Sequence, residues 1–111
     1  MDITSMQEGD VTIVNLIGRI DSSVAGQFES SVMGFLDQGV NRMVLTFTAL
    51  DYISSAGLRV LLMAAKRLKT SQGTFILCEL KDSIQEVLDV SGFAAVLTIE
   101  KTLGEAMKKA S

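Results

Sequence analysis

The sequence predicts a single α/β domain with a mixed, mostly parallel sheet and about four helices. Segments with the two-residue period of a strand alternate along the chain with segments that have the period of an amphipathic helix. No Pro-rich linker, internal repeat or low-complexity stretch divides the 111 residues, and Pro is absent. A chain of this length has room for one ordinary domain, so residues 1–111 are expected to fold as one unit.

Four segments have the composition or the alternation of strands. They are residues 11–17, 43–48, 74–80 and 96–99. In the second segment Met43, Leu45 and Phe47 occupy every other position, as in a strand whose two faces differ. The predicted order of elements is roughly β-β-α-β-α-β-α-β-α, with a further strand before residue 11.

Between the strand segments, apolar residues recur with the period of a helix. The stripe of the first helix is Val24, Phe28, Val32, Phe35 and Leu36, and that of the second is Leu58, Leu61, Leu62, Ala65 and Leu68. The first helix is expected to end near Gly39 and the second near residues 71–73. Lys66, Arg67 and Lys69 lie near the C-terminus of the second helix, where the helix dipole favours solvated cations.

Two further helices begin with the Ser/Thr-x-x-Glu pattern of a capping box, in which both side chains satisfy backbone N–H groups. The pattern occurs at residues 83–86 and 102–105. Gly92 is expected to cap the C-terminus of the first of these two helices. Strands that alternate with helices in this way predict right-handed crossovers and a mostly parallel sheet.

The carboxyl ends of the strands are the usual place for a site in such a sheet, because loops there lead into helix N-termini. Two segments follow strands in this way: Asp21-Ser22-Ser23, and residues 50–58. We expect them at the same edge of the sheet.

Composition excludes several classes of function. The net charge is −3 and no long Lys/Arg run is present, so neither nucleic acid nor an anionic membrane surface is an expected partner. The N-terminus lacks the pattern of a signal peptide, and no apolar run is long enough to cross a bilayer. The sequence therefore predicts a cytoplasmic protein without direct membrane insertion, whose partners are proteins.

The chemistry that the side chains offer is also limited. His is absent and Cys78 is the only cysteine, so the usual zinc and copper ligand sets and any internal disulfide are missing. No Ser-His or Cys-His nucleophile pair and no Gly-x-x-x-x-Gly-Lys loop occurs. We therefore expect no catalysis, no metal and no cofactor, and we expect Cys78 to be a small buried hydrophobe.

Ser54 and Ser55 are expected in the first turn of the helix that carries Leu58. A helix N-terminus offers free N–H donors and a partial positive charge, which stabilise an exposed phosphate by about 0.3 to 1 kcal/mol. A phosphoserine there would preserve the fold and, with about −1.5 to −2 charges, change what the surface can dock against. Gly57, without a side chain, is expected to let a partner's backbone approach closely.

The alternative is that one of the two serines only caps the helix, since Ser is a preferred N-cap residue. The two interpretations are compatible if Ser54 caps and Ser55 stays free to react.

A resemblance to a known family begins at these residues. Ile53-Ser54-Ser55-Ala56-Gly57-Leu58-Arg59-Val60-Leu61-Leu62 resembles the signature of STAS domains, specifically of bacterial anti-sigma-factor antagonists, whose usual form is Asp-Ser-Ser/Thr-Gly-Leu. Gly18-Arg19-Ile20-Asp21 resembles the family's Gly-x-Ile/Leu-Asp, and the resemblance covers nearly the whole chain. Aligned on Gly57-Leu58, the family's phosphorylated serine falls on Ser55, with Ser54 as a rival acceptor. Ser54 stands where the family frequently has Asp, which removes a carboxylate from the edge that faces the kinase.

The resemblance implies a non-catalytic partner switch. The unphosphorylated protein would bind an anti-sigma factor that is also a serine kinase and so free a sigma factor. Phosphorylation of Ser55 would end that binding, and a serine phosphatase of the metal-dependent type would restore it. The partner-binding residues implied are Asp21, Ser54, Ser55, Ala56, Gly57 and Arg59.

Two alternatives stay open. Asp21 would serve equally well as a cap of the helix that carries Val24. The same fold would also suit a STAS regulatory subunit of a membrane transporter or lipid-transport complex.

Overall fold

The computed structural model describes residues 1–111 as five strands, four α-helices and one 3₁₀-helix. The strands are β1 (Asp2–Glu8), β2 (Val11–Ile20), β3 (Arg42–Ile53), β4 (Thr74–Cys78) and β5 (Thr98–Glu100). The helices are α1 (Ala25–Asp37), α2 (Ser55–Thr70), α3 (Asp82–Ser91), the 3₁₀-helix η1 (Phe93–Ala95) and α4 (Leu103–Ala110). This order confirms the predicted alternation of strands and helices.

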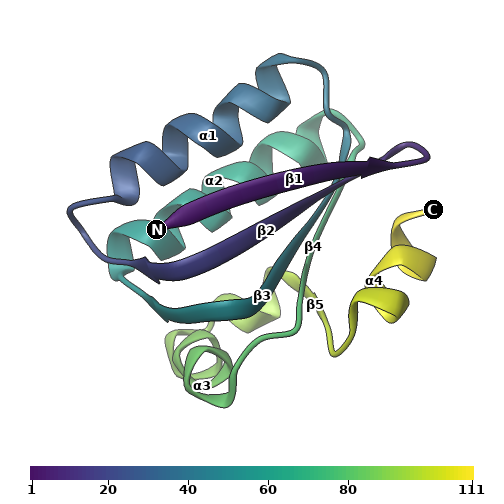
Figure 1. The fold of residues 1–111 in the computed structure, drawn as a ribbon. Coiled ribbons are helices and arrows are strands. Elements are labelled where there is room, and N and C mark those ends of the chain that lie inside the picture. Colours follow the sequence, from purple (N-terminus) through teal and green to yellow (C-terminus); the bar gives the residue numbers. More distant parts are fainter.

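The five strands form one sheet in the order β1-β2-β3-β4-β5. β1 and β2 pair antiparallel through a tight turn at Gly9, whose φ of 60° is readily adopted by Gly. The other three pairs are parallel, and α1, α2 and α3 make the connections between them. The sheet is therefore mixed and mostly parallel, as predicted (Figure 1).

The larger core lies between one face of the sheet and helices α1, α2 and α3. Met43, Leu45 and Phe47 point to this face from β3, and Phe28 of α1 and Leu61 of α2 pack against them. A smaller core lies between α4 and the opposite face. Figure 1 shows α1 and α2 side by side over the sheet, with α4 well apart from them. The helices thus sandwich a sheet whose carboxyl edge stays open.

The ends of several elements differ from the prediction. β2 continues to Ile20 past Gly18, because Gly18 adopts a φ of 96° at a shift in register and the pairing with β3 then resumes. β4 ends at Cys78, two residues early, where Glu79 takes a φ of 61°. β5 begins at Thr98, because η1 occupies the chain just before Val96.

One of the two predicted capping boxes is wrong. α3 begins at Asp82 with Lys81 as its N-cap residue and has no side-chain cap, so Ser83 lies inside the first turn. At α4 one half of the box is confirmed, since the Thr102 hydroxyl accepts from the Glu105 N–H at 3.1 Å, but the Glu105 carboxylate does not accept from the Thr102 N–H. Gly92 caps the C-terminus of α3 with a φ of 84°, also as predicted.

Candidate functional site

Two adjacent serines at the junction between β3 and α2 have different roles. Ser54 is the N-cap residue of α2, and its Oγ accepts a hydrogen bond from the Gly57 N–H at 3.2 Å. Its own N–H donates to the Ile20 carbonyl at 2.7 Å, which ties this turn to the end of β2. Ser55 is the first residue of α2, it is exposed, and its hydroxyl has no hydrogen-bond partner within the chain. Ser54 therefore caps the helix, while Ser55 presents a free hydroxyl.

Asp21 lies next to this junction because the strands before the two loops are paired. Ile20 is the partner of Ile53 in the parallel β2–β3 ladder, so Asp21 and Ser54 leave adjacent strand ends. The structure confirms that the two candidate loops share one edge of the sheet.

Hydrogen bonds within its own loop hold the Asp21 carboxylate. Its Oδ1 accepts from the Ser23 hydroxyl at 2.5 Å and from the Ser23 N–H at 2.9 Å. The hydroxyl bond is the main reason that the pKa of Asp21 lies below its ordinary value, so this edge carries a carboxylate anion at neutral pH. The N-cap residue of α1 is Val24, without a side-chain cap, so the alternative that Asp21 caps this helix is wrong. Asp21 instead organises the turn that precedes it.

Gly57 is explained by packing inside the domain. The residue is buried, and a Cβ at this position would lie 2.7 Å from Ile53 Cγ1 and 2.9 Å from Ile20 Cγ2. The expectation that the missing side chain makes room for a partner's backbone is therefore corrected, because side chains of this chain fill that space. The glycine lets α2 start close to the ends of β2 and β3.

The other motif residues lie on the surface. Arg59 is exposed one helical turn after Ser55, and Ala56 is half-exposed between them. The structure thus brings Asp21 and the Ser54–Ser55 turn to one edge of the sheet, with Arg59 exposed one turn along α2.

Two side-chain pairs at this edge were not predicted from the sequence. The Arg19 guanidinium lies 4.6 Å from the centre of the Tyr52 ring, across the β2–β3 ladder. Lys81, just before α3, forms an ion pair with Asp51 of β3, and this contact lowers the pKa of the Asp51 carboxyl. The strand register determines both pairs, and a single sequence does not show that register.

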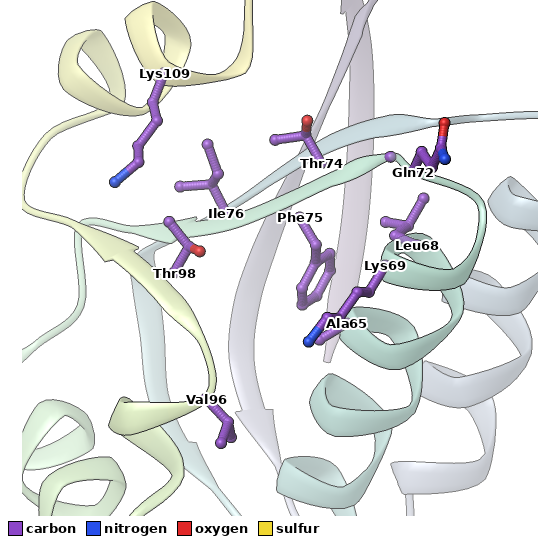
Figure 2. Close-up of a pocket in the computed structure, with 11 residues that line it drawn as sticks. Ala65, Leu68, Lys69, Gln72, Thr74, Phe75, Ile76, Val96, Thr98 and Lys109 are labelled. Atoms are coloured by element: carbon purple, nitrogen blue, oxygen red, sulfur yellow. The ribbon is translucent and has the colours of Figure 1, made fainter.

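The larger grooves of the surface lie elsewhere. One, of about 530 Å³, lies between the C-terminal half of α2, β4 and the chain that enters β5, with Phe75 and Ile76 among its lining residues (Figure 2). A second, also about 530 Å³, lies beside α3 and β5. Neither is lined by any of the six predicted partner-binding residues. These two grooves, the kind of concave site that a small ligand would need, therefore lie away from Ser55.

The side-chain chemistry elsewhere is limited. Cys78 is fully buried in β4, and burial first, then the charge of Glu79, raises the pKa of its thiol to about 11. No three acidic or cysteine side chains gather in a way that would hold a metal ion. None of the helices combines the length and the apolar character that crossing a membrane requires.

Comparison with known proteins gives consistent matches. The model of the STAS domain family matches residues 2–106. A protein of Bordetella bronchiseptica, BtrV, named as an anti-sigma factor antagonist, is 41% identical over 99 residues, which are 89% of this chain and 85% of BtrV.

Solved structures agree with this match. A Thermotoga maritima protein, also named as an anti-sigma factor antagonist, superposes with a TM-score of 0.93 at 25% identity, over 97% of this chain and 93% of that one. SpoIIAA in its unphosphorylated form superposes with a TM-score of 0.75 at 20% identity, over 97% and 96% of the two chains. The phosphorylated form of SpoIIAA from Bacillus has the same TM-score and identity, over 99% and 100%. At this identity the likeness to SpoIIAA shows the fold alone.

Proposed function

The chain belongs to the STAS domain family, and we propose that it is a bacterial anti-sigma-factor antagonist that is switched by phosphorylation of Ser55. The observation that carries the proposal is the division of roles at the start of α2. Ser54 Oγ is used as the helix cap, whereas the Ser55 hydroxyl is exposed and unpaired. Of the two rival acceptors, Ser55 is the one whose hydroxyl is exposed and makes no hydrogen bond in the chain.

The open edge around Ser55 supports binding of a protein partner. Asp21 follows the strand end next to the Ser54 turn, Arg59 lies one helical turn after Ser55, and the two larger grooves are lined by neither. In the unphosphorylated state this surface binds an anti-sigma factor that is also a serine kinase, and a sigma factor is released. The relatives are named as antagonists, and under this proposal the ATP and its metal belong to the kinase.

Phosphorylation changes binding and preserves the fold. The first turn of α2 carries no acidic residue, so a phosphate on Ser55 would meet only the positive end of the helix dipole and free N–H groups there. Docked against a partner, the same group with about −2 charges would be desolvated, which weakens the complex. A metal-dependent serine phosphatase then restores the binding form. The solved SpoIIAA, known in both phosphorylation states, provides a precedent within this fold.

The direct test is to purify the protein from its own cells and map its phosphate by mass spectrometry. The proposal expects a fraction of the chains to carry phosphate on Ser55 and an anti-sigma factor to copurify with the unphosphorylated fraction. Phosphate on Ser54 would contradict the acceptor assignment. A membrane permease in place of the anti-sigma factor would instead favour a regulatory subunit of a transporter.

A further inference from the structure

The charges of this chain are distributed unevenly, and α2 is the extreme case. Four of the ten Lys and Arg residues lie on this helix, and none of the thirteen Asp and Glu residues does. The four are Arg59, Lys66, Arg67 and Lys69. The side chains of α2 thus carry a charge of +4 in a chain whose net charge is −3.

Three of these cations share one stripe with Ser55. Residues 55, 59, 62, 66 and 69 are spaced by four and three positions, which places them on one helix face over roughly 21 Å. Arg59, Lys66 and Lys69 are exposed, whereas Leu61 and Leu68 are buried on the opposite side. We call the five residues of this face (Ser55, Arg59, Leu62, Lys66 and Lys69) the α2 stripe.

The cations of the α2 stripe are free of ion pairs. The ion pairs of the molecule join Arg67 to Asp37 at 2.6 Å, Lys81 to Asp51, and Lys109 to Glu100 at 3.7 Å. The helix dipole explains cations in the last turn of α2, but its effect is confined to the terminal turns and does not explain Arg59 near the start. The stripe is thus more than a solvated helix end.

The C-terminal end of the stripe borders a groove beside β4. Lys69 lines the groove of about 530 Å³ beside β4, with Lys109 of α4 on the opposite wall (Figure 2). No Asp or Glu is among its eleven lining residues. Lys69 is therefore the unpaired cation of this groove, because Lys109 on the other wall forms an ion pair with Glu100.

We propose that the α2 stripe docks an acidic surface of the partner protein, which under the proposed function is the anti-sigma factor. Charge complementarity carries the choice of occupant, because three unpaired cations in a row fit a matching row of carboxylates. A large polyanion fits less well, since a membrane or a nucleic acid also meets the net negative charge of the whole chain. Leu62, half-buried in the middle of the stripe, adds an apolar contact.

This surface explains how one phosphate would act as a switch. Ser55 lies at the N-terminal end of the stripe, and Arg59 is its neighbour at i+4. About −2 charges from a phosphate set against three unpaired cations leave the stripe with about +1. An acidic partner then loses most of the attraction and meets a new anion at close range.

The first test measures affinity for the anti-sigma factor of the same bacterium by calorimetry at 0.15 M salt. Arg59→Glu and Lys66→Glu should each weaken binding about tenfold, and the deficit should shrink at 1 M salt, where the Debye length is about 3 Å. Lys101→Glu makes the same charge change at an exposed position outside α2 and should bind like wild type. Equal affinity of wild type and a double variant that combines Arg59→Glu with Lys66→Glu would overturn the proposal.

Ser55→Asp, measured beside these variants, separates this inference from the proposed function. If Ser55→Asp weakens binding while Arg59→Glu and Lys66→Glu do not, the proposed switch is supported and the docking role of the α2 stripe is refuted. If Arg59→Glu and Lys66→Glu weaken binding while Ser55→Asp does not, the docking role is supported and the switch is refuted.

A second test needs no partner. Titration of the isotope-labelled chain with a deca-glutamate peptide should shift the NMR signals of residues 59–69, and Arg59→Glu/Lys66→Glu should abolish these shifts. Shifts elsewhere, no shifts, or a stronger response to phosphatidylglycerol vesicles or duplex DNA would overturn the choice of an acidic protein surface.

Discussion

Adjacent hydroxyls at the start of α2 differ in their hydrogen bonding, and this difference has a measurable consequence. Ser54 Oγ satisfies the Gly57 N–H, whereas the Ser55 hydroxyl satisfies nothing in the chain. Ser54→Ala should therefore lower the free energy of unfolding by about 0.5 to 2 kcal/mol. Ser55→Ala should stay within about 0.5 kcal/mol of wild type. Urea denaturation of the two variants measures both values, and the reverse order would show that Ser55 is the cap.

The need for glycine at position 57 is visible only in the folded chain. Gly57→Ala should cost about 1 to 3 kcal/mol, because its Cβ would meet Ile53 Cγ1 at 2.7 Å and Ile20 Cγ2 at 2.9 Å. Gly34→Ala in α1 is the matched control, since its Cβ would meet nothing within 4 Å. The control should gain about 0.5 to 1 kcal/mol from helix propensity. Thermal and urea unfolding test the contrast, and equal effects of the two substitutions would refute it.

At the scale of elements, periodicity predicted α1 and α2, capping patterns predicted α3 and α4, and the order of strands and helices was confirmed. The ends of the strands and helices were harder to predict, because they depend on contacts between residues distant in sequence. Gly18 suggests the end of a strand, yet β2 pairs with β3 as far as Ile20 through a shift in register. Ser83 matches the N-cap of a capping box, yet the N-cap of α3 is Lys81, two residues earlier. The N-cap predicted at Thr102 is present, because its hydroxyl accepts from the Glu105 N–H.

The start of α4 also depends on a contact that the sequence does not reveal. The Glu79 carboxylate accepts from the Leu103 N–H at 2.8 Å. Glu79 adopts a φ of 61°, which is unfavourable for a residue other than Gly. Glu79→Ala should lower the free energy of unfolding by about 1 to 3 kcal/mol, because a partly buried N–H loses its acceptor. Glu79→Gln keeps an acceptor oxygen and should recover most of the loss. Hydrogen exchange of the Leu103 amide should be faster in the Ala variant only, and equal rates in all three proteins would contradict the capping role.

For the whole molecule, the alternation of strands and helices was enough to place the candidate site. It predicted that Asp21 and the loop before Leu58 meet at one edge, and the pairing of Ile20 with Ile53 confirms this. It could not show the Arg19–Tyr52 contact, which depends on strand register. The unpaired state of the cations on α2 was equally hidden, because it depends on where every carboxylate lies in space. The acceptor role of Ser55 and the identity of the partner remain predictions.

The central claim is that charge at Ser55 controls binding while the fold persists. The measurement that tests it most directly is the binding constant of purified anti-sigma factor, with ADP, for four forms of this protein. The forms are wild type, Ser55→Ala, Ser55→Asp and protein phosphorylated at Ser55, each checked for an unchanged circular dichroism spectrum.

Wild type and Ser55→Ala should bind alike, because Ala removes only a free hydroxyl. The phosphorylated protein and Ser55→Asp should bind at least about tenfold more weakly, a difference of about 1.4 kcal/mol. If Ser55→Asp and the phosphorylated protein bound as tightly as wild type, phosphorylation of Ser55 would not be the switch.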